Sequence, residues 1–123
     1  MMDSSIAIEV KDSAFDPDST EKIIRVRNRE SDRPLYRVFL YVDGPDLPFV
    51  EAVTYELHPT FASPVRRVGR TLSNPRCKLE IWTWGLFEVA VTVEDKRGRQ
   101  YRLSHNLQYD RQFNERDVKF LPG

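Results

Sequence analysis

Residues 86–94 read LFEVAVTVE, and this stretch decides the fold class. Large apolar side chains occupy every second position, at Phe87, Val89, Val91 and Val93. Successive side chains of a β-strand point to opposite faces of the sheet, so this alternation predicts a strand with one buried face. We therefore expect Val89 and Val91 to lie in the core.

Other runs along the chain repeat the same period of two and are rich in β-branched and aromatic residues, which suit a pleated surface. They are residues 21–28 (EKIIRVRN), 35–42 (LYRVFLYV), 49–57 (FVEAVTYEL), 77–84 (CKLEIWTW) and 100–107 (QYRLSHNL). In the second of them Tyr36, Val38, Leu40 and Val42 share one face and are expected to be buried. Residues 111–123 (RQFNERDVKFLPG) fit either an edge strand or a tail.

Turn-forming residues separate these runs. They are grouped at Asp16-Pro17-Asp18, at residues 43–46 (DGPD) and at residues 95–98 (DKRG), where Gly98 is expected to supply a positive φ in a hairpin loop. No segment has a convincing helical period. Short strands at even spacing predict an all-β protein, an antiparallel β-sandwich or barrel, with about eight strands by analogy with immunoglobulin-type sandwiches.

Length and composition indicate one soluble domain spanning residues 1–123. The 19 basic residues balance the 19 acidic ones, so there is no overall attraction toward nucleic acid or an anionic membrane. The lone Cys77 cannot form an internal disulfide, which favours a reducing, intracellular compartment. No apolar run is long enough to span a bilayer. These features are equally consistent with one domain of a larger protein.

Two segments offer binding chemistry, residues 57–61 (LHPTF) and residues 82–87 (WTWGLF). Thr60 supplies a hydroxyl group, and Phe61 and Trp84 supply flat aromatic faces. Gly85 between two apolar strands is typical of a tight turn or a close backbone approach. Together these residues suit a narrow slot for a flat, neutral group.

Each of these residues also has an ordinary structural explanation. A histidine at a strand end, such as His58, more often braces a loop than contacts a ligand. Phe61 and Phe87 are more often core residues, and Trp84 before a glycine can simply cap the sheet end. Spacing alone therefore favours a slot only weakly.

Catalysis, metal binding and cofactor binding are not predicted. Neither histidine, His58 or His105, has a cysteine or carboxylate cluster with metal-ligand spacing. Cys77 fits packing in a strand better than a nucleophile. Arg66, Arg67 and Arg70 are explained as a solvated edge more readily than as a contact for an acidic partner.

Residues 49–68 (FVEAVTYELHPTFASPVRRV) resemble the central signature of YEATS domains. The family pattern F-V-x-x-V-x-y-x-L-H-x-[ST]-F-x-x-P-x-R is matched by Phe49, Val50, Val53, Leu57, His58, Thr60, Phe61, Pro64 and Arg66. Residues 84–89 (WGLFEV) resemble the family's G-W-G-x-F-x-I segment at the expected distance, and residues 36–44 (YRVFLYVDG) resemble its W-x-V-F-V-x-G strand. The resemblance covers about residues 36–93 and implies a family-like core at about 20–110.

The resemblance implies an immunoglobulin-like sandwich that reads acylated lysine, with the acyl group between aromatic side chains. Thr60 would supply the hydroxyl, Trp84 one wall and a backbone N–H, and Phe61 the facing wall. His58 would brace the loop, and Gly85 and Phe87 would shape the turn.

The chain departs from the family pattern in two places that bear on the site. Thr83 stands where the first glycine of G-W-G is usual, and residues 29–35 (RESDRPL) lack the aromatic residue that many readers place over the acyl chain. These departures suggest a divergent, prokaryotic YEATS-like member. We expect a non-catalytic module that binds an acylated lysine peptide, or alternatively a protein-docking module of a signalling or defence protein with a degenerate pocket. It would be cytoplasmic if prokaryotic and nuclear if it reads chromatin.

Overall fold

The computed structural model describes residues 5–27, 34–113 and 118–122, together with the backbone of residue 114. Strands dominate this part of the chain, and its two helical segments are short 3₁₀ turns. The strands are β1 (Glu9–Ser13), β2 (Ile23–Arg27), β3 (Leu35–Asp43), β4 (Val50–Glu56), β5 (Val65–Gly69), β6 (Leu79–Thr83), β7 (Glu88–Asp95), β8 (Gln100–Asn106) and β9 (Lys119–Pro122). The 3₁₀ turns are η1 (Leu47–Phe49) and η2 (Tyr109–Asn114). No described helix has the length and apolar character needed to cross a membrane.

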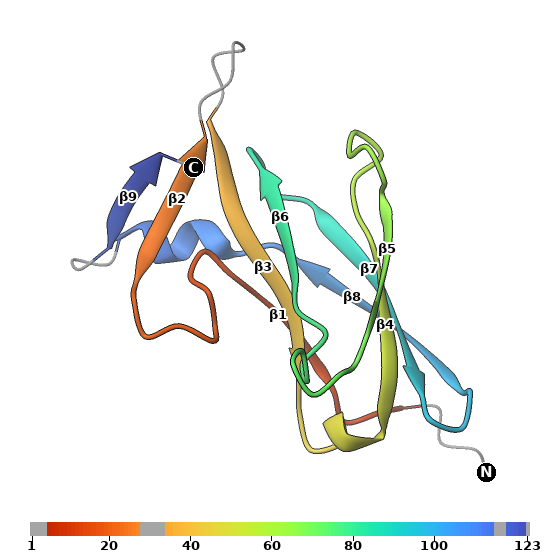
Figure 1. Ribbon diagram of the computed structural model, residues 1–123. Coiled ribbons are helices and arrows are strands. Elements are labelled where there is room, and N and C mark those ends of the chain that lie inside the picture. The colour runs from red at the N-terminus through yellow and green to blue at the C-terminus, as the bar shows by residue number, and fades with distance from the viewer. Residues whose placement is uncertain (1–4, 28–33, 115–117, 123) are drawn as a thin grey trace. The chain divides into compact units, whose positions relative to one another are not determined.

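One compact unit comprises Met1–Lys11, Tyr41–Lys78 and Phe87–Asn106. It contains a four-stranded antiparallel sheet in the order β5-β4-β7-β8 (Figure 1). Strand β7 lies in its middle, where Val91 is paired with Tyr55 of β4 and with Leu103 of β8. The Val89, Val91 and Val93 side chains are fully buried, as the alternation predicts. The strongest period-two stretch of the sequence is thus the central strand of this sheet.

The turns of this unit depend on two glycines with positive φ. Gly44 has a φ of 142°, and a Cβ there would lie 2.4 Å from the Ala7 carbonyl oxygen, so no other residue fits without a backbone shift. Gly98 has a φ of 85° in the loop that joins β7 to β8, which confirms the predicted hairpin.

The second unit comprises Asp12–Leu40, Leu79–Leu86 and Leu107–Gly123. Within it β3 is paired antiparallel with both β2 and β6. Strand β9 lies parallel to β2, with Ile24 opposite Phe120, so the ambiguous C-terminal stretch ends in an edge strand. Ile24, Val38 and Leu40 are fully buried.

The predicted core needs two corrections. Tyr36 is only half-buried, because its ring packs against Phe113 of η2, with ring centroids 4.7 Å apart, and not in the core beside Val38. Cys77 is buried but lies before β6 and has a φ of 51°. The Asn74 side chain, bonded to the Lys78 N–H and carbonyl at 2.8 and 3.0 Å, holds this segment as a turn. The described strands number nine, one more than the analogy suggested.

Candidate functional site

The loop between β4 and β5 is organised around His58. Its Nδ1 lies 2.9 Å from Thr60 Oγ1 and accepts the Thr60 backbone N–H at 3.3 Å. The Phe61 N–H donates to the His58 carbonyl at 3.0 Å. A backbone N–H can only donate, so in the tautomer that fits this contact Nδ1 is an acceptor and the Thr60 hydroxyl donates toward it. With its one proton directed at His58, Thr60 Oγ1 can still accept hydrogen bonds from other groups.

Aromatic rings stand beside this loop. The Phe61 and Phe87 ring centroids lie 5.6 Å apart with planes tilted by 56°, and the His58 ring meets Phe87 edge-on at 5.9 Å. Phe61 and Phe87 are half-buried, so neither is a plain core residue. His58 and Thr60 are exposed. One unit thus brings His58, Thr60, Phe61 and Phe87 together at the end of β4 and the start of β7.

The turn between β6 and β7 is braced at Gly85. The Thr83 hydroxyl donates to the Gly85 carbonyl at 3.2 Å and accepts the Gly85 N–H at 3.3 Å. The Tyr109 hydroxyl donates to the same carbonyl at 3.1 Å. Burial raises the pKa of Tyr109 to about 12, so the hydroxyl keeps its proton at neutral pH. Thr83 is buried, and this bracing is the role the structure gives it.

Large apolar side chains are exposed on this braced turn. Trp84 and Leu86 are each 54% exposed, on either side of Gly85. Gly85 does not have a positive φ, and a Cβ built on it would meet no described atom within 4 Å. The turn therefore does not require glycine for its own conformation, unlike the turns at Gly44 and Gly98.

The predicted site residues thus form two local arrangements, one in each unit. His58, Thr60, Phe61 and Phe87 belong to the first, and Thr83, Trp84 and Gly85 belong to the second. A slot with Phe61 and Trp84 as facing walls stays a prediction. Residues 28–33, which include most of the loop without the expected aromatic residue, lie outside the described part of the chain. Sequence reasoning missed Tyr109, which follows no strand pattern and has no local signal for its contact with Gly85.

The predicted basic edge is held by neighbouring groups of its own unit. The Arg66 Nε donates to the Ser63 carbonyl, and the Arg70 Nε donates to the Pro75 carbonyl at 3.0 Å. Arg67 forms an ion pair of 3.3 Å with Glu94. These contacts agree with the interpretation as a solvated edge. In the described residues no group of three or more His, Cys, Asp or Glu side chains is placed to hold a metal ion.

Comparison with known proteins identifies the family. The model of the prokaryotic YEATS domain matches residues 36–108. Transcription initiation factor TFIID subunit 14 of Schizosaccharomyces pombe (strain 972) is 34% identical over 76 residues, which cover 60% of this chain. The chain matches only 30% of the length of that curated relative.

Solved structures show the fold. The Yaf9 YEATS domain recognizing an H3K122suc peptide is 17% identical, with a TM-score of 0.54 over 86% of this chain and 70% of that one. The Yaf9 YEATS domain bound to H3K27ac is also 17% identical, with a TM-score of 0.52 over 86% of this chain and 78% of that one. Yeast Yaf9 itself, described as an AF-9 homologue, is 20% identical, with a TM-score of 0.51 over 67% and 61% of the two chains. This likeness confirms the predicted immunoglobulin-like β-sandwich. By its match to the family model over more than half its length, the chain belongs to the prokaryotic YEATS domain family.

Proposed function

We propose that the protein is a non-catalytic binding module that takes a planar acyl-amide, such as an acylated lysine, in an aromatic slot. The observation that carries this proposal is the turn at Gly85. An indole ring that is 54% exposed stands beside a glycine with open space at its Cβ position, on a backbone held by Thr83 and Tyr109. A rigid turn that presents an aromatic face beside open space suits the close approach of a flat group.

Hydrogen bonding in the His58 loop supports a polar role for Thr60 in this proposal. Because the Thr60 hydroxyl donates to His58 Nδ1, its oxygen is left to accept the N–H of the acyl-amide. His58 therefore positions Thr60 and does not itself contact the ligand. A backbone N–H of the Trp84 turn would meet the acyl carbonyl, as the family resemblance implies.

The expected affinity is modest. Stacking of a flat group on an aromatic ring contributes about 0.5–1.5 kcal/mol beyond the area buried. A neutral hydrogen bond contributes about 1 kcal/mol more. Such small contributions correspond to micromolar or weaker binding.

The Yaf9 YEATS domains with H3K122suc and H3K27ac support this class of ligand through the shared fold. The partner of this protein would be an acylated peptide of its own cell or another protein. We propose an intracellular location, which is cytoplasmic for a prokaryotic family member.

The test is titration of the ¹⁵N-labelled protein with lysine peptides carrying acetyl, crotonyl or succinyl groups, and with the unmodified peptide. We expect acyl-dependent shifts at residues 58–61 and 83–87. Trp84→Ala and Gly85→Ala should weaken binding at least fivefold, because one removes a wall and the other fills the open space. Leu72→Ala removes a fully exposed apolar side chain elsewhere and should change nothing.

Two results would overturn the proposal: unchanged binding by Trp84→Ala, or no binding of any acylated peptide by the wild type. A protein-docking module would then be the better description. Charge reversal at Arg66 and Arg67 would probe it.

A further inference from the structure

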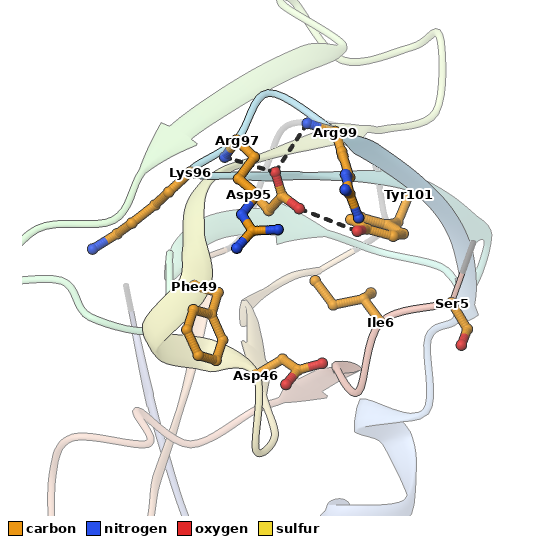
Figure 2. A pocket seen from close by; sticks show the side chains of 9 residues that line it. All are labelled: Ser5, Ile6, Asp46, Phe49, Asp95, Lys96, Arg97, Arg99 and Tyr101. Carbon is orange, nitrogen blue, oxygen red and sulfur yellow. Dashed lines mark hydrogen bonds between the residues drawn. The ribbon is translucent and has the colours of Figure 1, made fainter. Parts of the chain in front are cut away.

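A cavity of about 260 Å³ lies in the first unit, at the opposite end of its sheet from the His58 loop. The register shows this: Glu56, beside that loop, pairs with Ala90, whereas Val50 at the other end of β4 pairs with Asp95. The β7–β8 hairpin, the η1 turn and residues 5–6 line the cavity (Figure 2). None of the residues predicted to bind the acylated lysine lines this cavity.

The hairpin over this cavity is held rigid by Asp95. One carboxylate oxygen accepts the Arg97 and Arg99 backbone N–H groups, both at 2.9 Å. The other oxygen accepts the Tyr101 hydroxyl at 3.1 Å (Figure 2). The negatively charged carboxylate of Asp95 is thus hydrogen-bonded within the hairpin. It fixes the backbone from which the Arg97 and Arg99 side chains project.

The Arg97 guanidinium group has no structural task in the part of the chain that is described, and the Arg99 guanidinium group only adds a positive charge near Asp95. Neither makes a hydrogen bond or an ion pair there, and both residues are exposed. In Figure 2 the Arg97 guanidinium extends toward the Phe49 side of the cavity, and the Arg99 side chain lies beside Tyr101. The Lys96 ammonium points away from the other side chains.

The cavity also has an apolar side. Phe49, at the end of η1, is 61% exposed, and Ile6 also lines the cavity. Hydrogen bonds hold the backbone at or beside both: the Lys96 N–H donates to the Phe49 carbonyl at 2.9 Å, and the Asp46 carboxylate accepts the N–H of Ala7, next to Ile6, at 2.8 Å. A large aromatic ring beside two exposed guanidinium groups that make no hydrogen bond within the described residues is the combination found in protein-recognition sites.

We propose that this cavity binds a short acidic segment of a partner protein. Carboxylates of the segment would engage Arg97 and Arg99, and a neighbouring aromatic or aliphatic side chain would cover Phe49 and Ile6. Guanidinium groups bind carboxylates with two parallel N–H···O bonds, which makes arginine effective for this task. This site is separate from the acyl-amide slot and does not depend on it.

Size and charge select a peptide over other anions. Small-molecule sites usually occupy roughly 300–1,000 Å³, so a cavity of about 260 Å³ suits one or two side chains of a peptide. The wall also contains the Asp46 carboxylate, which can accept a peptide N–H. The whole chain has no excess of basic residues, which a nucleic-acid-binding surface normally needs.

The test uses the complete chain, labelled with ¹⁵N, and two blocked hexapeptides, Gly-Glu-Asp-Phe-Glu-Gly and its uncharged analogue Gly-Gln-Asn-Phe-Gln-Gly. The acidic peptide should shift the amides of residues 95–101 and of Phe49, and the analogue should not. Arg97→Ala combined with Arg99→Ala should weaken binding at least tenfold, and Phe49→Ala about threefold to tenfold. Lys96→Ala is the control: it removes one positive charge from the same hairpin, at an ammonium group that points away from the other side chains, and should change the affinity less than twofold.

The proposal is wrong if the uncharged analogue produces the same shifts, or if Lys96→Ala weakens binding as much as the double arginine variant. A single-stranded oligonucleotide that shifts the same amides more strongly than the acidic peptide would also overturn it, in favour of a nucleic-acid surface. Far-ultraviolet circular dichroism of each variant verifies folding, since Arg97, Arg99 and Lys96 are all exposed. Failure here would leave the acylated-lysine titration unaffected.

Discussion

At the scale of single residues, Asp95 holds the β7–β8 hairpin through several hydrogen bonds, although no pattern in the sequence predicts this role. Its side chain is only 9% exposed, and its two oxygens accept three hydrogen bonds from the hairpin that follows it. Burial by itself raises the pKa of this carboxyl group. The N–H groups of Arg99 and Arg97, the Tyr101 hydroxyl and the positive charge of Arg99 outweigh burial and lower the pKa below the usual value of 3.8.

This lowered pKa predicts a pH dependence of stability. A carboxyl group with a lower pKa in the folded state stabilises the fold above its unfolded pKa, and this stabilisation is lost as the pH falls below about 4. We therefore expect Asp95→Asn to lower the melting temperature at pH 7 and to differ less from the wild type at pH 3. Thermal unfolding from pH 7 to pH 3 measures this.

The control is Glu51→Gln, which neutralises an exposed carboxylate on β4 and should leave the wild-type profile unchanged. If Asp95→Asn lost the same number of degrees at pH 3 as at pH 7, the ionised form of Asp95 would not be the stabilising one.

At the scale of elements, the turn between β6 and β7 is held by contacts with a distant segment. The Gly85 carbonyl accepts from Thr83 within the turn and from Tyr109 of η2. These contacts allow Trp84 and Leu86 to remain exposed on a turn that is nevertheless fixed. Their loss should affect both stability and the presentation of Trp84.

We expect Tyr109→Phe to lower the free energy of unfolding by about 0.5–1.5 kcal/mol, the usual net value of one hydrogen bond. Thr83→Val should cost about 1–3 kcal/mol, because the half-buried Gly85 N–H and carbonyl each lose a hydrogen bond to the Thr83 hydroxyl. Urea unfolding measures both values, and the acyl-peptide titration should weaken in parallel.

Tyr41→Phe is the matched control. The Tyr41 hydroxyl has no hydrogen bond to the described residues. The free energy of unfolding of this variant should therefore stay within about 0.5 kcal/mol of the wild-type value. Equal losses for Tyr41→Phe and Tyr109→Phe would show that the Gly85 contact contributes nothing.

At the scale of the whole molecule, the two proposed sites use opposite ends of the same strands. The His58 loop follows β4, and η1 precedes it. A seven-residue strand spans roughly 20 Å, which separates the Thr60 loop from the cavity under the β7–β8 hairpin. Substitutions farther apart than about 10 Å, with no shared partners, usually act independently.

Independent sites predict additive effects. Thr60→Ala should weaken binding of the acylated peptide and leave binding of the acidic peptide within twofold of the wild type. The double change of Arg97 and Arg99 to alanine should do the reverse, and the combined variant should show both losses. Titration of each variant with both peptides measures the coupling. Mutual weakening beyond twofold would indicate that both peptides compete for one site.

Local sequence patterns determined the fold class and the family. The alternation at residues 86–94 predicts a strand because successive side chains of an extended chain point to opposite faces. The hairpin at residues 95–98 followed from Gly98, since a positive φ is a local property. The match of residues 49–68 to YEATS domains likewise needed only residue order and spacing. The same reasoning failed at Cys77, where the alternation continues but Asn74 holds a turn.

Only the tertiary structure decided which distant residues contact one another at the ends of the strands. The contact between Tyr109 and Gly85 joins residues 24 positions apart, and that between Asp46 and Ala7 joins residues 39 positions apart. No local pattern encodes such pairs, because they depend on which strands pair and in which register. Burial of Asp95 and exposure of Phe49 are decided in the same way. Asp95 and Phe49 both lie at the ends of strands that the sequence predicts. The cavity proposed for the acidic peptide forms because β4 and β7 pair antiparallel, which brings η1 beside the β7–β8 hairpin.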